Sequence, residues 1–143
     1  MALYRQGRVP GSVYTGRGQE AVAAGAGLAL GPDDVVAPLN CELACHFARG
    51  VEVADVFRNF FGKVTGPTAG RDGNMHFGYP GEGIFPLVSM LGDLVPVVTG
   101  AALTFKRRRQ PRVAMTFVGE GAFSETRTRA STSRRCGRCR PCS

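Results

Sequence analysis

A carboxylate flanked by two glycines follows the last apolar run of the chain. Residues 113–118 (VAMTFV) have the length and character of a strand in a parallel sheet covered on both faces, and Gly119-Glu120-Gly121-Ala122 comes directly after them. In sheets of this kind, ligands lie beyond the carboxyl ends of the strands. Glycine amides can approach phosphate oxygens closely, and a carboxylate beside them can hold Mg²⁺. This turn therefore predicts a phosphate and magnesium site, although a plain turn has the same pattern.

Hydrophobic spacing and helix-stop residues predict the elements that would position this turn. We expect helices over residues 19–30, 42–49, 53–61 and 94–105, and strands over residues 35–37 and 113–118. Residues 1–16 and the Gly- and Pro-rich residues 62–86 predict loops. A loop as long as the second is usually functional in a compact domain. The order of elements predicts an α/β fold with a parallel sheet flanked by helices.

Composition limits the classes of protein to which the chain can belong. Of its 143 residues, 43% are apolar and 20% charged, which excludes disorder along the whole length. The sequence has no apolar run long enough to cross a membrane, and Met1–Pro10 does not resemble a secretory signal. The net charge of +7 is concentrated after Glu125, where six of the 18 basic residues and no acid are found. We therefore expect two unlike segments, residues 1–125 and 126–143.

Six short motifs occur in one order along residues 10–125. They are Gly18-Gln19-Glu20-Ala21-Val22; Ala48-Arg49-Gly50; Phe61-Gly62-Lys63; Gly70-Arg71-Asp72-Gly73-Asn74-Met75-His76; Val95-Pro96 with Gly100-Ala101-Ala102-Leu103; and Phe117-Val118-Gly119-Glu120-Gly121-Ala122. In these motifs the chain resembles the alpha subunit of thiamine-diphosphate-dependent 2-oxo acid dehydrogenases. These enzymes are the first component of the pyruvate, branched-chain 2-oxo acid and acetoin dehydrogenase complexes.

The resemblance implies a thiamine-diphosphate-binding fold, of which residues 1–125 would be an incomplete N-terminal portion. It also implies thiamine diphosphate and Mg²⁺ as cofactors and a beta subunit as partner in an α₂β₂ assembly. The reaction implied is oxidative decarboxylation of a 2-oxo acid substrate, with acyl transfer to the lipoyl group of an acyltransferase. The protein would position and shield the cofactor, which carries the chemistry. Pyruvate, branched-chain 2-oxo acids and acetoin all remain open as substrates.

The same resemblance implies roles for individual residues. Glu120 would be the metal ligand, and Gly119, Gly121 and Ala122 would form the diphosphate turn. Ser89 and Leu91 occupy positions where backbone groups would meet the aminopyrimidine ring. His76 would lie near the active-site channel, or alternatively would be a loop histidine bonded to backbone.

Asn40 and Cys41 depart from the family pattern. They stand at the positions of a Tyr-Arg pair whose arginine contacts the diphosphate. A fixed cation binds phosphate more strongly than a neutral group, so affinity for the cofactor comes into question. Cys41 and Cys45 are four residues apart. We interpret them as two buried thiols rather than a metal-binding pair.

The segment after Glu125 does not continue the family pattern. A one-base shift of the reading frame allows residues 126–143 to be read as Asp-Thr-His-Ala-Gly-Leu-Asn-Phe-Ala-Ala-Val-Arg-Ala-Leu-Pro-Pro-Val-Leu, which resembles the family's next helix and strand. We therefore hypothesise a frameshift and expect the printed tail to be disordered. The alternative is a zinc or nucleic-acid module, since Cys136, Cys139 and Cys142 have metal-like spacing beside six arginines, but a fourth ligand is missing. We expect neither a nucleic-acid nor a membrane partner.

The chain as printed lacks the family's second metal ligand, an Asn beyond the Gly119–Gly121 turn. We therefore expect low stability and no dehydrogenase activity, which measurable CO₂ release from a 2-oxo acid would contradict. The alternative function is a non-catalytic remnant that docks a beta subunit through the small-residue helix 94–105. Free thiols and the absence of a leader pattern favour the bacterial cytoplasm.

Sequencing the gene from codon 110 to several hundred bases past codon 143 tests the frameshift hypothesis. We expect the shifted frame to encode the Asp-Thr-His text above, because a family-like residue at nearly every step is improbable by chance. A shifted frame that encodes unrelated residues would remove the hypothesis and return the tail to its printed reading.

Overall fold

The computed structural model describes residues 2–122 of the chain. Its elements are α1 (Ala2–Arg5), α2 (Glu20–Ala29), β1 (Val35–Ala37), α3 (Leu43–Ala48), α4 (Val53–Phe60), the 3₁₀ turn η1 (Pro80–Glu82), α5 (Leu94–Arg107), β2 (Ala114–Thr116) and the 3₁₀ turn η2 (Glu120–Ala122). The predicted helices and strands are confirmed to within two residues at each end. The predictions for residues 126–143 lie outside the described residues. None of the described helices is long and apolar enough to cross a membrane.

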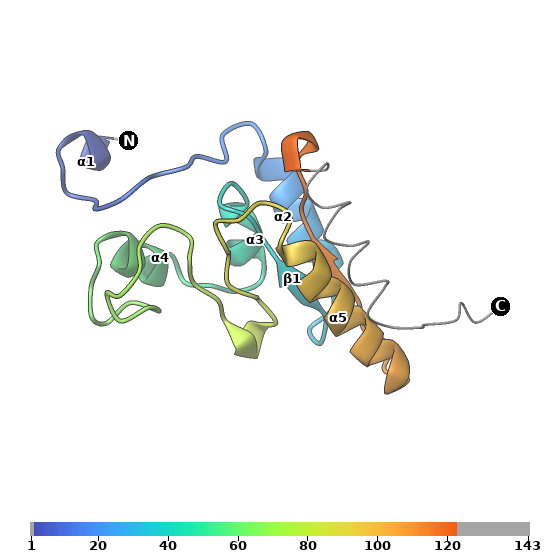
Figure 1. Cartoon of the computed structure of the whole chain (residues 1–143). Helices are drawn as coiled ribbons and strands as arrows, with labels where there is room; N and C mark the ends of the chain where they lie inside the picture. Colours follow the sequence, from blue (N-terminus) through green and yellow to red (C-terminus); the bar gives the residue numbers. More distant parts are fainter. Residues whose placement is uncertain (1, 123–143) are drawn as a thin grey trace.

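The prediction of a loop over residues 1–16 was wrong at its beginning. Residues Ala2–Arg5 form the short helix α1, which buries no side chain. One helical turn is too short for apolar residues to repeat at helical spacing, so the sequence carries no periodic signal there. Figure 1 shows that α1 is joined to the rest of the chain by an extended segment.

The sheet consists of β1 and β2, which run parallel (Figure 1). Val36 pairs with Met115 at the centre of the register. On its other side, Val36 forms a parallel bridge with Ile84, in which its N–H donates to the Gly83 carbonyl at 2.8 Å. The long loop after α4 therefore serves β1 as a partial third strand. This is the coarse α/β arrangement that the sequence predicts.

Helices complete the core around this small sheet. All three residues of β1 are buried. Those of β2 are only half-buried, so the expectation that residues 113–118 form a strand covered on both faces is wrong for the described structure. α5 packs against both strands, and α2 packs against α3. The second contact needs Gly27, because a Cβ there would lie 2.8 Å from the Cβ of Ala48. Small residues in α2 therefore set how closely the two helices approach.

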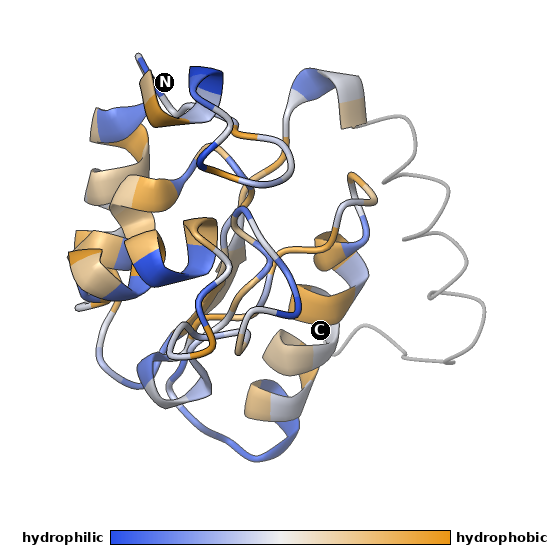
Figure 2. Cartoon of the chain, turned by 90° about the vertical axis from the view of Figure 1, so that its left-hand side faces the viewer, coloured by the Kyte–Doolittle hydropathy of each residue, from blue (hydrophilic) through white to orange (hydrophobic). Residues whose placement is uncertain are grey.

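Asp34 joins the beginnings of the two strands. Its Oδ1 accepts the Val113 N–H at 2.6 Å, and its Oδ2 accepts the Gly31 N–H at 2.8 Å, which closes a turn over residues 31–34 before β1. The hydrogen bonds from these two backbone groups lower the pKa of Asp34 below its usual value. Figure 2 shows the segment after α5, at the same end of the molecule, as strongly hydrophilic.

Arg49 follows α3 and binds carbonyl groups from two separate turns. Its guanidinium donates to the Gly31 carbonyl at 2.7 Å and the Asp34 carbonyl at 3.1 Å, both in the turn before β1. It also donates to the Glu82 carbonyl of η1 at 2.7 Å. Gly83 allows this close approach, because it has φ +68° and a Cβ there would lie 2.3 Å from the Asp34 carbonyl oxygen. One planar cation therefore holds η1 against the start of the sheet.

The Arg49→Lys variant should lower the free energy of unfolding by about 2 kcal/mol. A lysine ammonium cannot match the planar fork of donors that reaches both turns, and charged hydrogen bonds contribute about 1.5–3 kcal/mol each. Urea unfolding of the purified chain measures the effect. Arg58→Lys is the matched control, because Arg58 pairs with Asp55 at the surface and should cost less than about 0.5 kcal/mol. Equal losses in the two variants would contradict the role of Arg49.

His46 is a buried imidazole in α3 and is 2% exposed. Its Nδ1 lies 3.4 Å from the Glu42 carbonyl oxygen, and its ring packs against Phe77 with centroids 5.1 Å apart. Burial lowers the pKa of His46 to about 4. The folded chain therefore binds fewer protons than the unfolded chain between about pH 4 and the ordinary histidine pKa of about 6.5.

The free energy of unfolding should fall by about 3 kcal/mol from this one group as the pH is lowered from about 6.5 to 4. The reason is that the imidazole is protonated in the unfolded chain over this range, whereas buried His46 stays neutral in the folded chain. Burial raises the pKa of Glu42, so this carboxyl acts in the opposite direction on acidification. The His46→Asn variant keeps a donor for the Glu42 carbonyl and does not titrate. Denaturant unfolding across this pH range should give the steeper loss in the wild type. Parallel curves for the two chains would contradict the assignment.

Candidate functional site

A cavity of about 270 Å³ brings together four residues that the sequence predicts for the site. It lies between the N-terminal segment and the two halves of the long loop between α4 and α5. The predicted residues in its lining are Asn40, His76, Ser89 and Leu91. They are up to 51 positions apart in the chain, and the fold places them around one hollow.

Alternating burial fixes the position of His76. Met75 and Phe77 are 1% and 2% exposed, and both belong to the hydrophobic core. His76 stands between them with its ring half-buried and lines the cavity. The core therefore anchors the backbone on both sides of the imidazole.

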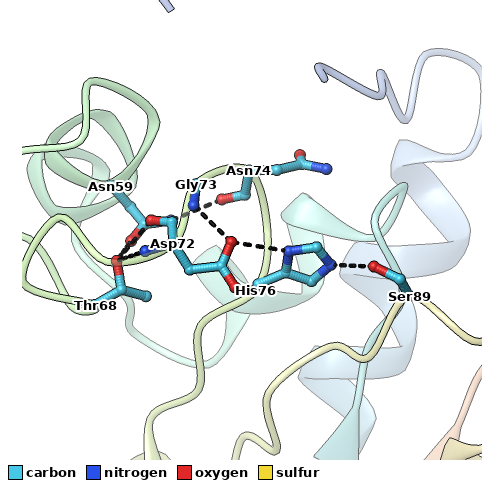
Figure 3. Close-up of polar contacts among 7 residues, drawn as sticks. All are labelled: Asn59, Thr68, Asp72, Gly73, Asn74, His76 and Ser89. Atoms are coloured by element: carbon cyan, nitrogen blue, oxygen red, sulfur yellow. Dashed lines mark hydrogen bonds and ion pairs between the residues drawn. The ribbon is translucent and has the colours of Figure 1, made fainter. Parts of the chain in front are cut away.

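The imidazole of His76 is held by two side chains (Figure 3). Its Nδ1 lies 3.2 Å from Asp72 Oδ1, and its Nε2 lies 2.7 Å from Ser89 Oγ. The alternative of a loop histidine bonded to backbone is wrong for the described structure, since both ring nitrogens have side-chain partners. Asp72 is a site residue that the sequence reasoning did not single out, although it lies within the Gly70–His76 motif.

Buried Asn59 of α4 ties down the loop that carries this group (Figure 3). Its Nδ2 donates to the Asn74 carbonyl at 2.8 Å, and its Oδ1 lies 2.8 Å from Thr68 Oγ1. Thr68 Oγ1 is in turn 2.7 Å from the Asp72 carbonyl oxygen. Asn74 has φ +52° and is 7% exposed, and its Oδ1 has no hydrogen-bond partner although Asn74 lines the cavity. An orphaned buried acceptor at a cavity suggests a ligand that donates a hydrogen bond.

A second cavity of about 310 Å³ lies at the carboxyl ends of β1 and β2. The start of α2 and the residues that follow each strand line it: Gln19, Val22, Ala23, Leu39, Asn40, Cys41, Glu42, Phe117, Val118 and Gly119. Gly119 and Cys41, both predicted for the diphosphate, therefore face one hollow. Asn40 lines this cavity and the first one, so the two are neighbours.

The second cavity contains no Lys or Arg among its lining residues. Its acidic residue is Glu42, which is 8% exposed and accepts the Leu39 N–H at 2.9 Å. Burial raises the pKa of both Glu42 and Cys41, and the charge of Glu42 adds to the effect on the Cys41 thiol. Cys41 is thus a neutral thiol at a position where the resemblance implies an arginine.

The prediction of two buried thiols is confirmed for Cys45 and wrong for Cys41. Cys45 is buried within α3, as predicted, whereas Cys41 precedes the helix and is only half-buried. Cys41 also borders a larger apolar hollow of about 640 Å³ between the N-terminal segment and α4. No cluster of three metal-binding side chains exists within residues 2–122.

Glu120 begins η2, after the residues 117–119 that follow β2, and is exposed. A Cβ placed on Gly119 or Gly121 would meet no atom within 4 Å, so the turn on both sides of this carboxylate is open. Ala122 is buried, and its N–H donates to the Gly119 carbonyl at 3.1 Å. The structure therefore places a single exposed carboxylate at the end of the sheet, beside the second cavity.

Comparison with protein-family models shows the family of the chain. The model of the dehydrogenase E1 component matches residues 1–132. The chain belongs to the dehydrogenase E1 component family. Its relatives include the alpha subunit of acetoin:2,6-dichlorophenolindophenol oxidoreductase of Bacillus subtilis, which is 31% identical over 86% of the chain and 37% of the relative.

Other similar proteins differ in the substrate that their names give. Pyruvate dehydrogenase E1 component subunit alpha type II of Ascaris suum is 32% identical over 86% of the chain and 31% of the relative. 2-Oxoisovalerate dehydrogenase subunit alpha 1 of Arabidopsis thaliana is 31% identical over 85% of the chain and 25% of the relative. The E1 chain thus spans between a quarter and about two fifths of these relatives' lengths. Near-equal identities to all three do not distinguish between their substrates.

Proposed function

We propose that the chain supplies the diphosphate-binding part of an E1 alpha subunit, in a thiamine-diphosphate-dependent dehydrogenase that decarboxylates a 2-oxo acid. The observation that carries the proposal is Asn40, which lines both cavities. The residues predicted for the aminopyrimidine, Ser89 and Leu91, line the first cavity. The predicted diphosphate turn borders the second. Two adjoining hollows with these linings suit an elongated cofactor with a ring at one end and a diphosphate at the other.

The residues of the second cavity fit a diphosphate accompanied by a divalent cation. Gly119 lines the cavity, and space is open where a Cβ would lie on Gly119 or Gly121. The first turn of α2 offers the partial positive charge of a helix N-terminus. Glu120 would be the protein ligand of Mg²⁺, which commonly takes one or two carboxylates together with phosphate oxygens. When bound, thiamine diphosphate would supply the group that attacks the 2-oxo carbon.

The partners proposed for the E1 chain are a beta subunit and a lipoyl-bearing acyltransferase. The exposed side of α5 supports a docking role, because it combines apolar Val97 and Leu103 with open space around Gly100. A non-catalytic docking function would need only this face and not the cavities. The test is co-purification of the chain with a beta subunit. Co-purification by the wild type that is lost in the Gly100→Asn variant would support docking through α5. Equal co-purification by both chains would place the contact elsewhere.

Restoring a cation at position 41 tests the diphosphate site. The Cys41→Arg variant should bind thiamine diphosphate, in the presence of Mg²⁺, roughly 10- to 100-fold more tightly than the wild type. The estimate follows from about 1.5–3 kcal/mol for a hydrogen bond to a charged group and 1.4 kcal/mol per tenfold in affinity. Equilibrium dialysis measures both dissociation constants.

Cys41→Met is the matched control, because it adds length without charge and should leave the affinity unchanged within a few-fold. Thiamine, which lacks the diphosphate, is the control ligand and should show no gain with the arginine. Equal affinities of the Arg and Met variants for thiamine diphosphate would contradict the placement of the diphosphate beside residue 41. Absence of binding by every variant would count against the proposed function itself.

A further inference from the structure

Asp72, His76 and Ser89 form a row of hydrogen bonds, and the chemistry of Asp72 determines which nitrogen of His76 carries the proton. An ionised carboxylate only accepts hydrogen bonds, so a neutral His76 must carry its proton on Nδ1, 3.2 Å from Asp72 Oδ1. Nε2 is then unprotonated and accepts from the Ser89 hydroxyl at 2.7 Å. The opposite tautomer would set the lone pair of Nδ1 against the carboxylate oxygen.

We propose that Asp72 is a positioning residue that keeps His76 in the Nδ1–H tautomer, so that Nε2 is the proton acceptor presented to the first cavity. The class of ligand rests on the proposed function, but the tautomer does not. A ligand hydroxyl that took the place of Ser89 Oγ would face this nitrogen. On transfer, the O–H bond breaks, an Nε2–H bond forms and the electron pair stays on the ligand oxygen. The resulting imidazolium lies beside the Asp72 carboxylate, which stabilises it.

The structure holds Asp72 independently of His76. The same Oδ1 accepts the Gly73 N–H at 2.7 Å, and the Asp72 carbonyl oxygen lies 2.7 Å from Thr68 Oγ1. Thr68 contacts Asn59, which is 1% exposed (Figure 3). Asp72 therefore has contacts with the loop after α4 that do not involve the imidazole. This is the arrangement expected of a group that orients another.

A second observation points to a ligand at this place. Asn74 is more than nine-tenths buried, lines the same cavity as Asp72, His76 and Ser89, and has an unpartnered Oδ1. Asn74 Oδ1 and His76 Nε2 are thus two acceptors on residues that line one cavity. Both groups are acceptors, so the ligand class that they favour carries two hydrogen-bond donors, such as hydroxyl or amino groups.

The tautomer can be measured directly because the chain has only two histidines. In the His46→Asn background, His76 is the only imidazole. The ¹⁵N shifts of a histidine-labelled sample, recorded at a pH where the ring is neutral, show which nitrogen carries the proton. We expect the Nδ1–H form to predominate in this chain. Predominance of the Nε2–H form, which a free imidazole favours, would overturn the proposal.

Three variants in the same background separate the role of Asp72 from that of its neighbours. Asp72→Ala should shift the majority of the signal to the Nε2–H form. Asp72→Asn keeps an acceptor oxygen at the same place and should retain the Nδ1–H form. Ser89→Ala removes the other partner and should also retain it. An Asp72→Ala chain whose backbone amide spectrum is unchanged and whose His76 remains Nδ1–H would overturn the role of Asp72.

Equilibrium dialysis with thiamine diphosphate on the same samples distinguishes this inference from the proposed function. If the chain binds no cofactor but His76 is in the Nδ1–H form, the proposed function is contradicted and the inference about Asp72 stands. If the chain binds the cofactor but His76 is in the Nε2–H form, the proposed function stands and the inference is contradicted.

Discussion

The contacts of the Arg49 guanidinium are the constraint on which the arrangement of the described chain depends. β1 has three residues and β2 has three, so their mutual hydrogen bonds alone could not fix the position of the long loop that completes the sheet. Arg49 supplies that position by binding carbonyls on both sides of the junction. Once η1 is held, Gly83 and Ile84 fall beside Val36, and the following residues lead to Ser89 at the cavity. Within residues 2–122 the sheet has two strands, and the hydrogen bonds of Arg49 hold the loop in place where a larger sheet would use further strands.

The two ends of the strands are used for different purposes. At the amino ends, the side chains of Asp34 and Arg49 form hydrogen bonds with backbone groups of the chain itself. At the carboxyl ends, Glu120 is exposed and Asn74 has an orphaned oxygen in a neighbouring cavity. Polar groups that satisfy one another stabilise a fold, whereas those left open are available to a ligand. This contrast, seen in one small structure, locates the candidate site without reference to any relative.

The sequence predicted the elements well because their signals are local. α4 has its apolar residues at helical spacing, and Gly31-Pro32-Asp33-Asp34 before β1 is a sequence typical of a turn. The one-turn helix α1 was missed because it has no such signal. The site was predictable only through the resemblance to the family, which indicated His76 and Ser89 separately. Their hydrogen bond joins residues 13 positions apart in a Gly- and Pro-rich loop, and no periodicity specifies such a path.

The tie from Asn59 to the loop was likewise beyond sequence reasoning. Asn59 is one of several polar residues of α4, with Asp55 and Arg58, and nothing local indicated that it alone would be buried. Its partners, Thr68 and the Asn74 carbonyl, lie nine and 15 positions away in irregular chain. Buried amides of this kind find their partners only when the tertiary structure is complete, because each must be satisfied by whatever backbone passes nearby.

The electrostatics of the second cavity constrain how the proposed cofactor could enter. Glu42 borders the cavity beside the neutral Cys41 thiol, and burial raises the pKa of both groups, which shows that the surroundings disfavour negative charge. A bare diphosphate would add more negative charge where no basic side chain lines the wall. A divalent cation bound to the diphosphate removes most of that cost before contact is made. If the chain binds the cofactor as proposed, we therefore expect binding of the diphosphate and of Mg²⁺ to be more strongly coupled in the wild type than in the Cys41→Arg variant.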